Sequence, residues 1–156
     1  MFQPDLDLVR KYNQPGPRYT SYPTAPHFNE DTDKSALAAQ TETEDSDLSL
    51  YFHIPFYRSL CWFCGCTKII TTQQDKADHY LDLLEKEIEL FLPRIKAGRK
   101  VRQLHFGGGT PNYLTTAQID RFSKFIHSHF EFHDDAELST ELDPRTLTEE
   151  HIAAFR

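Results

Sequence analysis

An alternation of strand-type and helix-type segments after residue 47 is the feature that most restricts how this chain can fold. Three segments alternate apolar and polar residues as half-buried strands do: 48–54, 101–106 and 136–142. Three helix-type segments lie between and after them: 75–97, 115–130 and 146–156. A β-α-β-α-β-α order favours a parallel sheet with right-handed crossovers. We therefore expect an α/β fold built on parallel strands.

Local signals mark several of the expected boundaries. Gly98 is expected to stop the first helix. Thr115 with Gln118 makes a capping box for the second helix, and Thr146 with Glu149 could cap the third. Three strands with only their own helices leave a sheet edge uncovered. We therefore expect residues 48–156 to form the front part of a larger, truncated barrel.

Residues 1–47 look like an irregular N-terminal arm and linker that precede the barrel segments. Residues 5–12 could form one short helix. The segment 14–26 carries four prolines and should run extended, because proline and the residue before it disfavour helix. Residues 41–47 are acidic and should be solvated.

The composition of the 156-residue chain argues against several classes of protein. With 24 acidic against 17 basic residues and a formal charge of −7, no interface dominated by nucleic-acid phosphates is expected. No apolar stretch approaches the ~20 residues that span a bilayer, and the N-terminus carries no secretory signal. Three clustered cysteines do not make a disulfide framework. We expect a cytoplasmic protein without nucleic-acid or membrane partners.

Three motifs stand where the three expected strands end. A loop that holds all three cysteines of the chain (61–66) follows the first strand, G-G-G-T-P (107–111) follows the second, and E-L-D-P (141–144) closes the third. In α/β barrels and open parallel sheets, functional groups collect at the C-terminal ends of the strands. The shared placement predicts one functional site at this edge of the sheet.

Each motif has a functional and a plain interpretation. Cys61, Cys64 and Cys66 supply soft thiolates that suit an iron–sulfur cluster or, together with His53, a zinc ion; inert structural thiols are the alternative. The glycine run lets the backbone approach a ligand, and its amides could meet a carboxylate, although three glycines also make ordinary turns. Glu141 is either a solvated carboxylate or an acceptor for a ligand's amine or hydroxyls.

Taken in order, these motifs resemble the start of a radical S-adenosylmethionine (SAM) enzyme. The resemblance is carried by Y-F-H-I-P-F-x3-L-C-W-F-C-G-C, by L-H-F-G-G-G-T-P and by E-L-D-P-R. The leader P-G-P-R-Y-T-S-Y-P-T-A is similar to that of the oxygen-independent coproporphyrinogen III dehydrogenases (oxidases). The similarity runs from about Tyr12 to Arg156. It implies a partial (β/α) barrel of which this chain is the N-terminal portion.

The resemblance also implies cofactors and site residues. In this family C-x3-C-x2-C holds a 4Fe–4S cluster, whose open iron binds the amino and carboxylate groups of SAM. Cys61 and Cys64 would be cluster ligands, whereas Cys66 lies outside the three-ligand motif. Six residues would bind SAM: Tyr51 and Phe63 would line its site, Gly108, Gly109 and Thr110 would contact its methionyl end, and Glu141 would contact its polar groups.

The activity implied by the resemblance is that of an oxidoreductase of haem and porphyrin biosynthesis. A 5′-deoxyadenosyl radical abstracts hydrogen from two propionate side chains of coproporphyrinogen III, which lose carbon dioxide and become the vinyl groups of protoporphyrinogen IX. An unidentified electron donor would reduce the cluster. The full-length family protein would be a monomer, and the arm with Arg18 would help to enclose its active site.

Tyr57 departs from this pattern, because it stands where the first cluster cysteine is expected. A phenolate is a harder donor than a thiolate, and the ordinary phenol pKa of about 10 disfavours the ligand form at neutral pH. The phenol is also bulkier, so we expect the loop to move. Our hypothesis is that the chain binds the cluster poorly or not at all. Replacement by Cys66 would need a rearranged loop.

Three other functions stay open from the sequence. The chain could be a non-catalytic relative that binds haem or porphyrin, a small zinc-binding module, or an inactive gene remnant. Titration with haem and SAM separates the first from the enzyme, and stoichiometric zinc without SAM affinity would favour the second.

Overall fold

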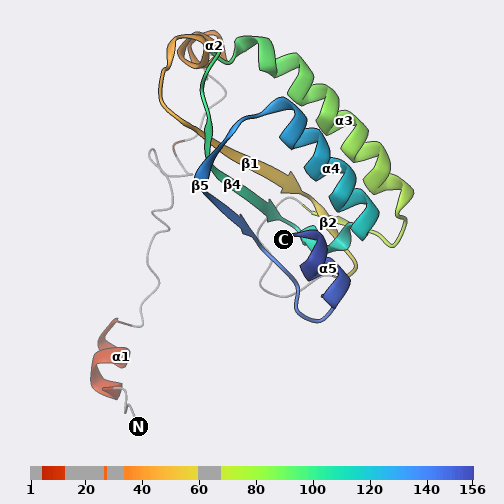
Figure 1. Ribbon diagram of the computed structural model, residues 1–156. Coiled ribbons are helices and arrows are strands. Elements are labelled where there is room, and N and C mark those ends of the chain that lie inside the picture. The colour runs from red at the N-terminus through yellow and green to blue at the C-terminus, as the bar shows by residue number, and fades with distance from the viewer. Residues whose placement is uncertain (1–4, 13–26, 28–33, 60–67) are drawn as a thin grey trace. The chain divides into compact units, whose positions relative to one another are not determined.

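The computed structural model describes residues 5–12, 27, 34–59 and 68–156, and the chain divides into two units, Met1–Lys34 and Ser35–Arg156 (Figure 1). The first unit contains helix α1 (Leu6–Tyr12), which confirms the short helix predicted in the arm. The Asp5 carboxylate begins this helix by accepting hydrogen bonds from the amides of Asp7 and Leu8. The site and its supporting sheet lie in the second unit.

A three-stranded parallel sheet forms the centre of the second unit. Its strands are β1 (Leu48–Ile54), β4 (Val101–Gly108) and β5 (Phe132–Thr140), in the order β1-β4-β5. The predicted parallel sheet is therefore confirmed. β4 continues into the glycine run, and β5 begins four residues earlier than the alternation from Ala136 predicts. The earlier start follows from pairing, since Phe132 lies opposite Val101 in β4.

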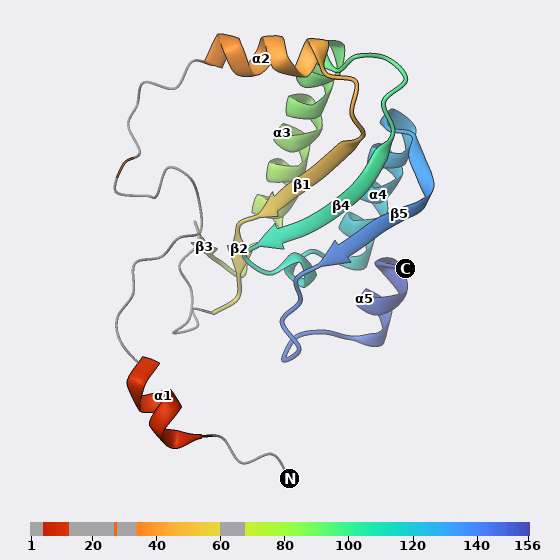
Figure 2. The same cartoon turned by 90° about the vertical axis from the view of Figure 1, so that its left-hand side faces the viewer.

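Two helices cover one face of this sheet, α3 (Asp75–Phe91) and α4 (Thr116–His129) (Figures 1 and 2). The apolar side chains of the strands face them and form one core, in which the ring of Phe122 contacts those of Phe52 and Phe106 edge-on. The buried core residues are Leu48, Phe52, Ile54, Phe56, Ala77, Leu81, Ile88, Val101, Leu104, Tyr113, Leu114, Ile119, Phe122 and Ile126.

The helix ends correct two predictions and confirm one. α3 stops at Phe91 rather than near Gly98, because Pro93 cannot donate the amide hydrogen that continues a helix; a 3-10 turn, η2 (Leu92–Arg94), follows. The capping box of Thr115 and Gln118 is present at α4. Helix α5 (Glu149–Ala154) is capped by Thr148, not by Thr146.

Besides η2, four elements of the described residues were not predicted from the sequence. Helix α2 (Lys34–Thr43) lies inside the expected irregular arm, and its sequence is rich in good helix formers such as alanine. The 3-10 turn η3 (Pro111–Tyr113) follows the glycine run. Two strands of two residues each, β2 (Phe56–Tyr57) and β3 (Ile69–Ile70), pair in parallel just beyond β1. Such short elements give no periodic signal.

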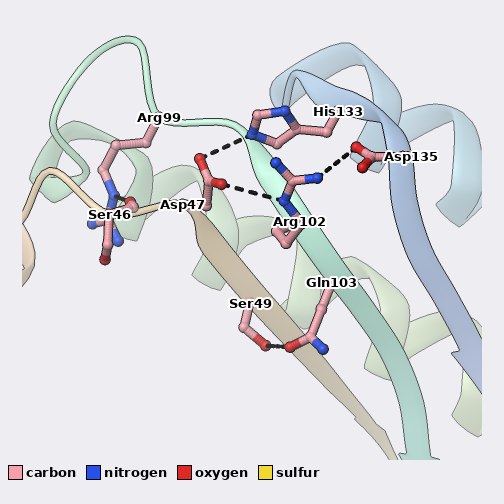
Figure 3. A network of polar contacts seen from close by, with 8 residues as sticks. All are labelled: Ser46, Asp47, Ser49, Arg99, Arg102, Gln103, His133 and Asp135. Carbon is pink, nitrogen blue, oxygen red and sulfur yellow. Dashed lines mark hydrogen bonds and ion pairs between the residues drawn. The ribbon is translucent and has the colours of Figure 1, made fainter.

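A polar network joins the three strands at their N-terminal ends (Figure 3). The Asp47 carboxylate accepts a hydrogen bond from His133 Nε2 at 2.9 Å and another from Arg102 Nε at 3.3 Å. Arg102 also pairs with Asp135 of β5. The bond from His133, followed by that from Arg102, holds the pKa of the Asp47 carboxyl below its ordinary value.

At the opposite end of the sheet, the buried Asn112 side chain holds the loop that follows β5. Its amide nitrogen donates to the Asp143 carbonyl and to Thr146 Oγ1, both at 3.0 Å, and its oxygen accepts from the Asp143 amide at 2.9 Å. The residue is 1% exposed. Asn112 therefore fixes the loop that carries Glu141.

We expect Asp47→Asn to lower stability at pH 7 and to matter less in acid. A carboxyl whose pKa is lowered in the folded state stabilises the fold above its unfolded pKa of about 3.8, and this contribution is lost as the pH falls through the folded pKa. Urea midpoints of both proteins at pH 7 and pH 3 test this. Asp134→Asn, an exposed carboxylate of β5 outside the drawn network, is the control. An equal loss at both pH values would contradict the prediction.

Asn112→Ala is expected to lower the free energy of unfolding by about 1–3 kcal/mol, because it leaves the partly buried backbone amide and carbonyl of Asp143 without their partner. Urea denaturation measures the loss. Gln103→Ala removes an exposed polar side chain of β4 and should cost under about 0.5 kcal/mol. Equal losses for the two variants would show that Asn112 does not hold the loop.

Candidate functional site

The face of the sheet opposite α3 and α4 carries polar side chains. In Figure 2 the three strands lie in front of these two helices. The parallel register places Tyr51, His105 and Ser139 beside one another across β1, β4 and β5. His53 lies two residues further along β1 than Tyr51, nearer the C-terminal edge of the sheet, and is opposite Gly107. The strand ends therefore present an ordered polar surface at the edge where the sequence predicted a site.

Hydrogen bonds and ring stacking connect this surface. The Tyr51 hydroxyl and His53 Nδ1 share a hydrogen bond of 2.9 Å. The Tyr51 ring stacks on the His105 ring, with centroids 5.8 Å apart and planes 14° from parallel. His105 Nδ1 in turn shares a hydrogen bond of 2.8 Å with Ser139 Oγ. The three strands are thus tied together by side chains as well as by backbone.

Glu141 lies directly after β5, and its backbone amide donates to the Phe106 carbonyl at 2.9 Å. One carboxylate oxygen, Oε2, accepts a hydrogen bond from the Gly108 amide at 3.2 Å. The other, Oε1, lies 4.0 Å from His105 Nε2. The side chain is 60% exposed, so the carboxylate is accessible to a ligand at the end of β4.

The glycine loop fits its place because its residues lack side chains. Gly108 has a φ of +106°, and a Cβ there would lie 2.5 Å from the His53 ring. A Cβ on Gly109 would lie 2.6 Å from the Ile54 carbonyl oxygen and 2.7 Å from that of Phe56. The run is therefore a close approach of two backbones and not an ordinary turn.

The amides of this loop are mostly engaged inside the protein. The Gly109 amide donates to the Ile54 carbonyl at 2.7 Å, and the Thr110 amide donates to the Phe56 carbonyl at 3.0 Å. The Gly108 amide meets a carboxylate, but one that belongs to Glu141 of the same chain. A ligand at the loop would therefore meet its carbonyls and the Glu141 carboxylate before these amides.

Tyr57 fits into the structure as a buried residue of β2. It is 8% exposed, and its hydroxyl donates a hydrogen bond of 2.9 Å to the Gly108 carbonyl. Its neighbour Phe56 stacks on Tyr113, with ring centroids 5.2 Å apart. The phenol is thus part of the packing beneath the glycine loop.

Sequence reasoning missed three residues of this region. His105 and Ser139 both fall on the polar side of their strands, and that alternation was a usable signal. Tyr80 lies within the helix predicted over 75–97, and its hydroxyl donates to the His53 carbonyl at 2.7 Å. Burial raises the pKa of the Tyr80 hydroxyl, so it remains a hydrogen-bond donor. No sequence pattern shows which backbone group a helix tyrosine will reach.

Of the predicted site residues, five come together at the ends of β1, β4 and β5: Tyr51, Gly108, Gly109, Thr110 and Glu141. Cys61, Cys64 and Phe63 lie outside the described residues, as does Cys66. Among the residues that are described, no group of three His, Cys, Asp or Glu side chains could hold a metal ion. In the same part of the chain, every helix is too short or too polar to cross a membrane.

Comparison with known proteins gives a consistent result. No family model matches the chain. Three curated relatives named oxygen-independent coproporphyrinogen III oxidase come from Escherichia coli K12, Mannheimia haemolytica and Helicobacter pylori 26695. They are 56%, 48% and 41% identical to this chain, over 92%, 90% and 95% of it. The chain spans 31% of the E. coli relative and 34% of the H. pylori relative, but 96% of the M. haemolytica one.

A solved structure leads to the same family. The coproporphyrinogen III oxidase of E. coli, described as a radical SAM enzyme, matches 97% of this chain with a TM-score of 0.82 and 50% sequence identity. The match covers 33% of that protein. The fold expected from the resemblance, parallel strands with helices as in part of a radical SAM barrel, is thereby confirmed. The chain belongs to the family of oxygen-independent coproporphyrinogen III oxidases.

Proposed function

We propose that this chain binds SAM at the C-terminal ends of β1, β4 and β5, as the cofactor-binding part of an oxygen-independent coproporphyrinogen III oxidase. The observation that carries the proposal is the meeting of Glu141 with the Gly108 backbone, beside the stacked rings of Tyr51 and His105. The family's radical SAM chemistry implies SAM as a cofactor. Five of the six residues assigned to SAM by resemblance, all except Phe63, converge at this edge.

The chemistry of SAM suits this group of residues. Its methionyl ammonium can donate charge-assisted hydrogen bonds to the exposed Glu141 carboxylate and to carbonyls of the glycine loop. Its sulfonium carries a positive charge that an aromatic face attracts, and the Tyr51 side chain is 57% exposed. Thr110 follows the loop with a side chain that can donate and accept. Phe63 is proposed as a further contact on resemblance alone.

The substrate and reaction are proposed from the family. The relatives are oxidases of coproporphyrinogen III, and we propose that the process served by this fold is the conversion of two of its propionate side chains to vinyl groups, which gives protoporphyrinogen IX. A cytoplasmic location, an unidentified electron donor and a monomeric state of the full-length family protein belong to the same proposal. So does the division into an arm, 1–47, and barrel segments, 48–156.

The family's 4Fe–4S cluster does not fit this chain in the usual way. The three-thiolate pattern requires cysteines at positions 57, 61 and 64, and position 57 holds a buried tyrosine whose hydroxyl donates to the Gly108 carbonyl. A phenol oxygen engaged with a carbonyl is a poor substitute for a soft thiolate. We therefore derive no step of the reaction through a cluster and assign to this chain the binding of SAM.

A second candidate is a non-catalytic relative that binds porphyrin or haem. The buried tyrosine at position 57 favours it, because it stands where the first cluster cysteine is expected and the fold of the oxidase family is still present. Equilibrium titration with SAM and, separately, with haem distinguishes the two functions. Saturable binding of SAM without haem supports the cofactor-binding function, and saturable binding of haem without SAM supports the carrier.

Glu141→Gln is expected to weaken SAM binding about tenfold or more, because it removes the charge that pairs with the ligand's ammonium while keeping the size of the side chain. Isothermal titration calorimetry measures the change. Glu137→Gln is the matched control, since Glu137 lies in β5 and bonds Gln103, away from the glycine loop. Equal weakening by both variants would point to a general charge effect and count against the site.

Gly108→Ala is expected to abolish SAM binding and to destabilise the fold, because a methyl group would strike the His53 ring at a positive φ. Gly98→Ala is a matched control: Gly98 also has a positive φ, +87°, but nothing lies within 4 Å of its Cβ position. Both should lose about 1 kcal/mol of stability from the backbone. Only Gly108→Ala should lose more and fail to bind SAM; normal SAM binding by this variant would contradict the site.

A further inference from the structure

We infer that Tyr57 is a structural tie between β2 and the glycine loop, and that a residue engaged in this tie does not supply the third ligand of a 4Fe–4S cluster. The inference concerns the same edge of the sheet as the proposed SAM site and rests on that assignment for its functional meaning. It is argued from the contacts of Tyr57 itself, namely its buried ring, its bond to Gly108 and the backbone bonds around it.

The backbone on both sides of Tyr57 is held in place. Its carbonyl accepts from the Thr71 amide at 3.0 Å, and the carbonyl of Pro55 accepts from the Ile69 amide at 2.7 Å. The Phe56 carbonyl, one residue earlier, accepts from the Thr110 amide at 3.0 Å. β2 is therefore fastened to β3 on one side and to the end of the glycine run on the other. Moving residue 57 outward would break several of these bonds.

The hydroxyl can serve the loop or a metal, but not both. Donation to the Gly108 carbonyl requires the phenol proton. An iron ligand would be the deprotonated oxygen, which has no proton to donate and would face the carbonyl oxygen with like partial charge. Because the hydroxyl is buried against that carbonyl, ligation would also strip the carbonyl of its partner. The observed bond therefore defines residue 57 as part of the fold.

The tie completes the fastening of Gly108, which is held from three directions. Its amide donates to Glu141, its carbonyl accepts from Tyr57, and its Cα lies against the His53 ring. The loop that carries the proposed SAM contacts is thus ordered by the chain's own side chains. We infer that the loop takes this conformation in protein that contains no iron.

Anaerobic reconstitution of the full 156-residue chain with iron and sulfide tests whether Tyr57 excludes the cluster. Iron and sulfide content and electron paramagnetic resonance would be measured for the native chain, Tyr57→Phe and Tyr57→Cys. We expect substoichiometric iron in the native chain and in Tyr57→Phe, and about four iron atoms per chain in Tyr57→Cys, where a third thiolate joins Cys61 and Cys64.

Two outcomes would overturn the inference. A stoichiometric 4Fe–4S centre in the native chain means that Tyr57 does not exclude it, whether or not Tyr57→Phe also holds one. Absence of a centre in a folded Tyr57→Cys protein, with folding checked by circular dichroism, means that residue 57 is not what excludes the cluster. None of these readouts uses SAM, so the inference and the proposed SAM site can fail separately.

Unfolding of the metal-free chain tests the tie directly. Tyr57→Phe keeps the ring and removes only the donor to Gly108, so the unfolding equilibrium constant should rise about threefold to tenfold in the presence of a chelator. Tyr80→Phe, which removes the donor to the His53 carbonyl, is the matched control for losing a tyrosine hydroxyl. In the anaerobic reconstitution, Tyr80→Phe should leave the iron content at the level of the native chain. Unchanged stability of Tyr57→Phe would overturn the tie, even if the chain binds no iron.

Discussion

The pairing of β4 with β1 on one side and β5 on the other is the interaction on which the rest of the structure depends. Because the three strands run in parallel, their C-terminal ends meet at one edge, and Tyr51 and Ser139 lie on either side of His105. The helices cover one face, so the other is left to polar side chains. Asp47 and Arg102 fasten the far end of the same strands. The parallel direction of the strands therefore determines where the candidate site lies.

The glycine loop is held by hydrogen bonds from several parts of the fold and also carries the proposed SAM contacts. The carbonyls of Ile54 and Phe56 accept hydrogen bonds from the two amides that follow Gly108. The Gly108 amide donates to Glu141, and the Gly108 carbonyl accepts from Tyr57. In this fold residue 57 donates a hydrogen bond to the loop, and our inference is that a residue so engaged does not also ligate a cluster.

Much of the architecture could be predicted because it rests on local signals. The alternation in β1 and the capping box of Thr115 and Gln118 appear in the structure as predicted. Other elements rest on distant partners. β2 and β3 are two residues each and form only because they pair with one another. Thr146 was the predicted cap of the third helix, but Asn112 engages its hydroxyl, and Thr148 caps the helix instead.

The sequence by itself determined the fold class, the family, and the convergence of Tyr51, the glycine run and Glu141. The reason is that the alternation of strand residues and the order of the motifs can be read directly from the sequence. It also marked Tyr57 as a departure. Only the tertiary structure shows which groups surround its side chain. The expectation that a bulky phenol would move its loop concerns residues 60–67, which lie outside the part of the chain that the structure describes. Whether a side chain is strained or satisfied depends on the groups that surround it, and here the Gly108 carbonyl, far along the chain, accepts its proton.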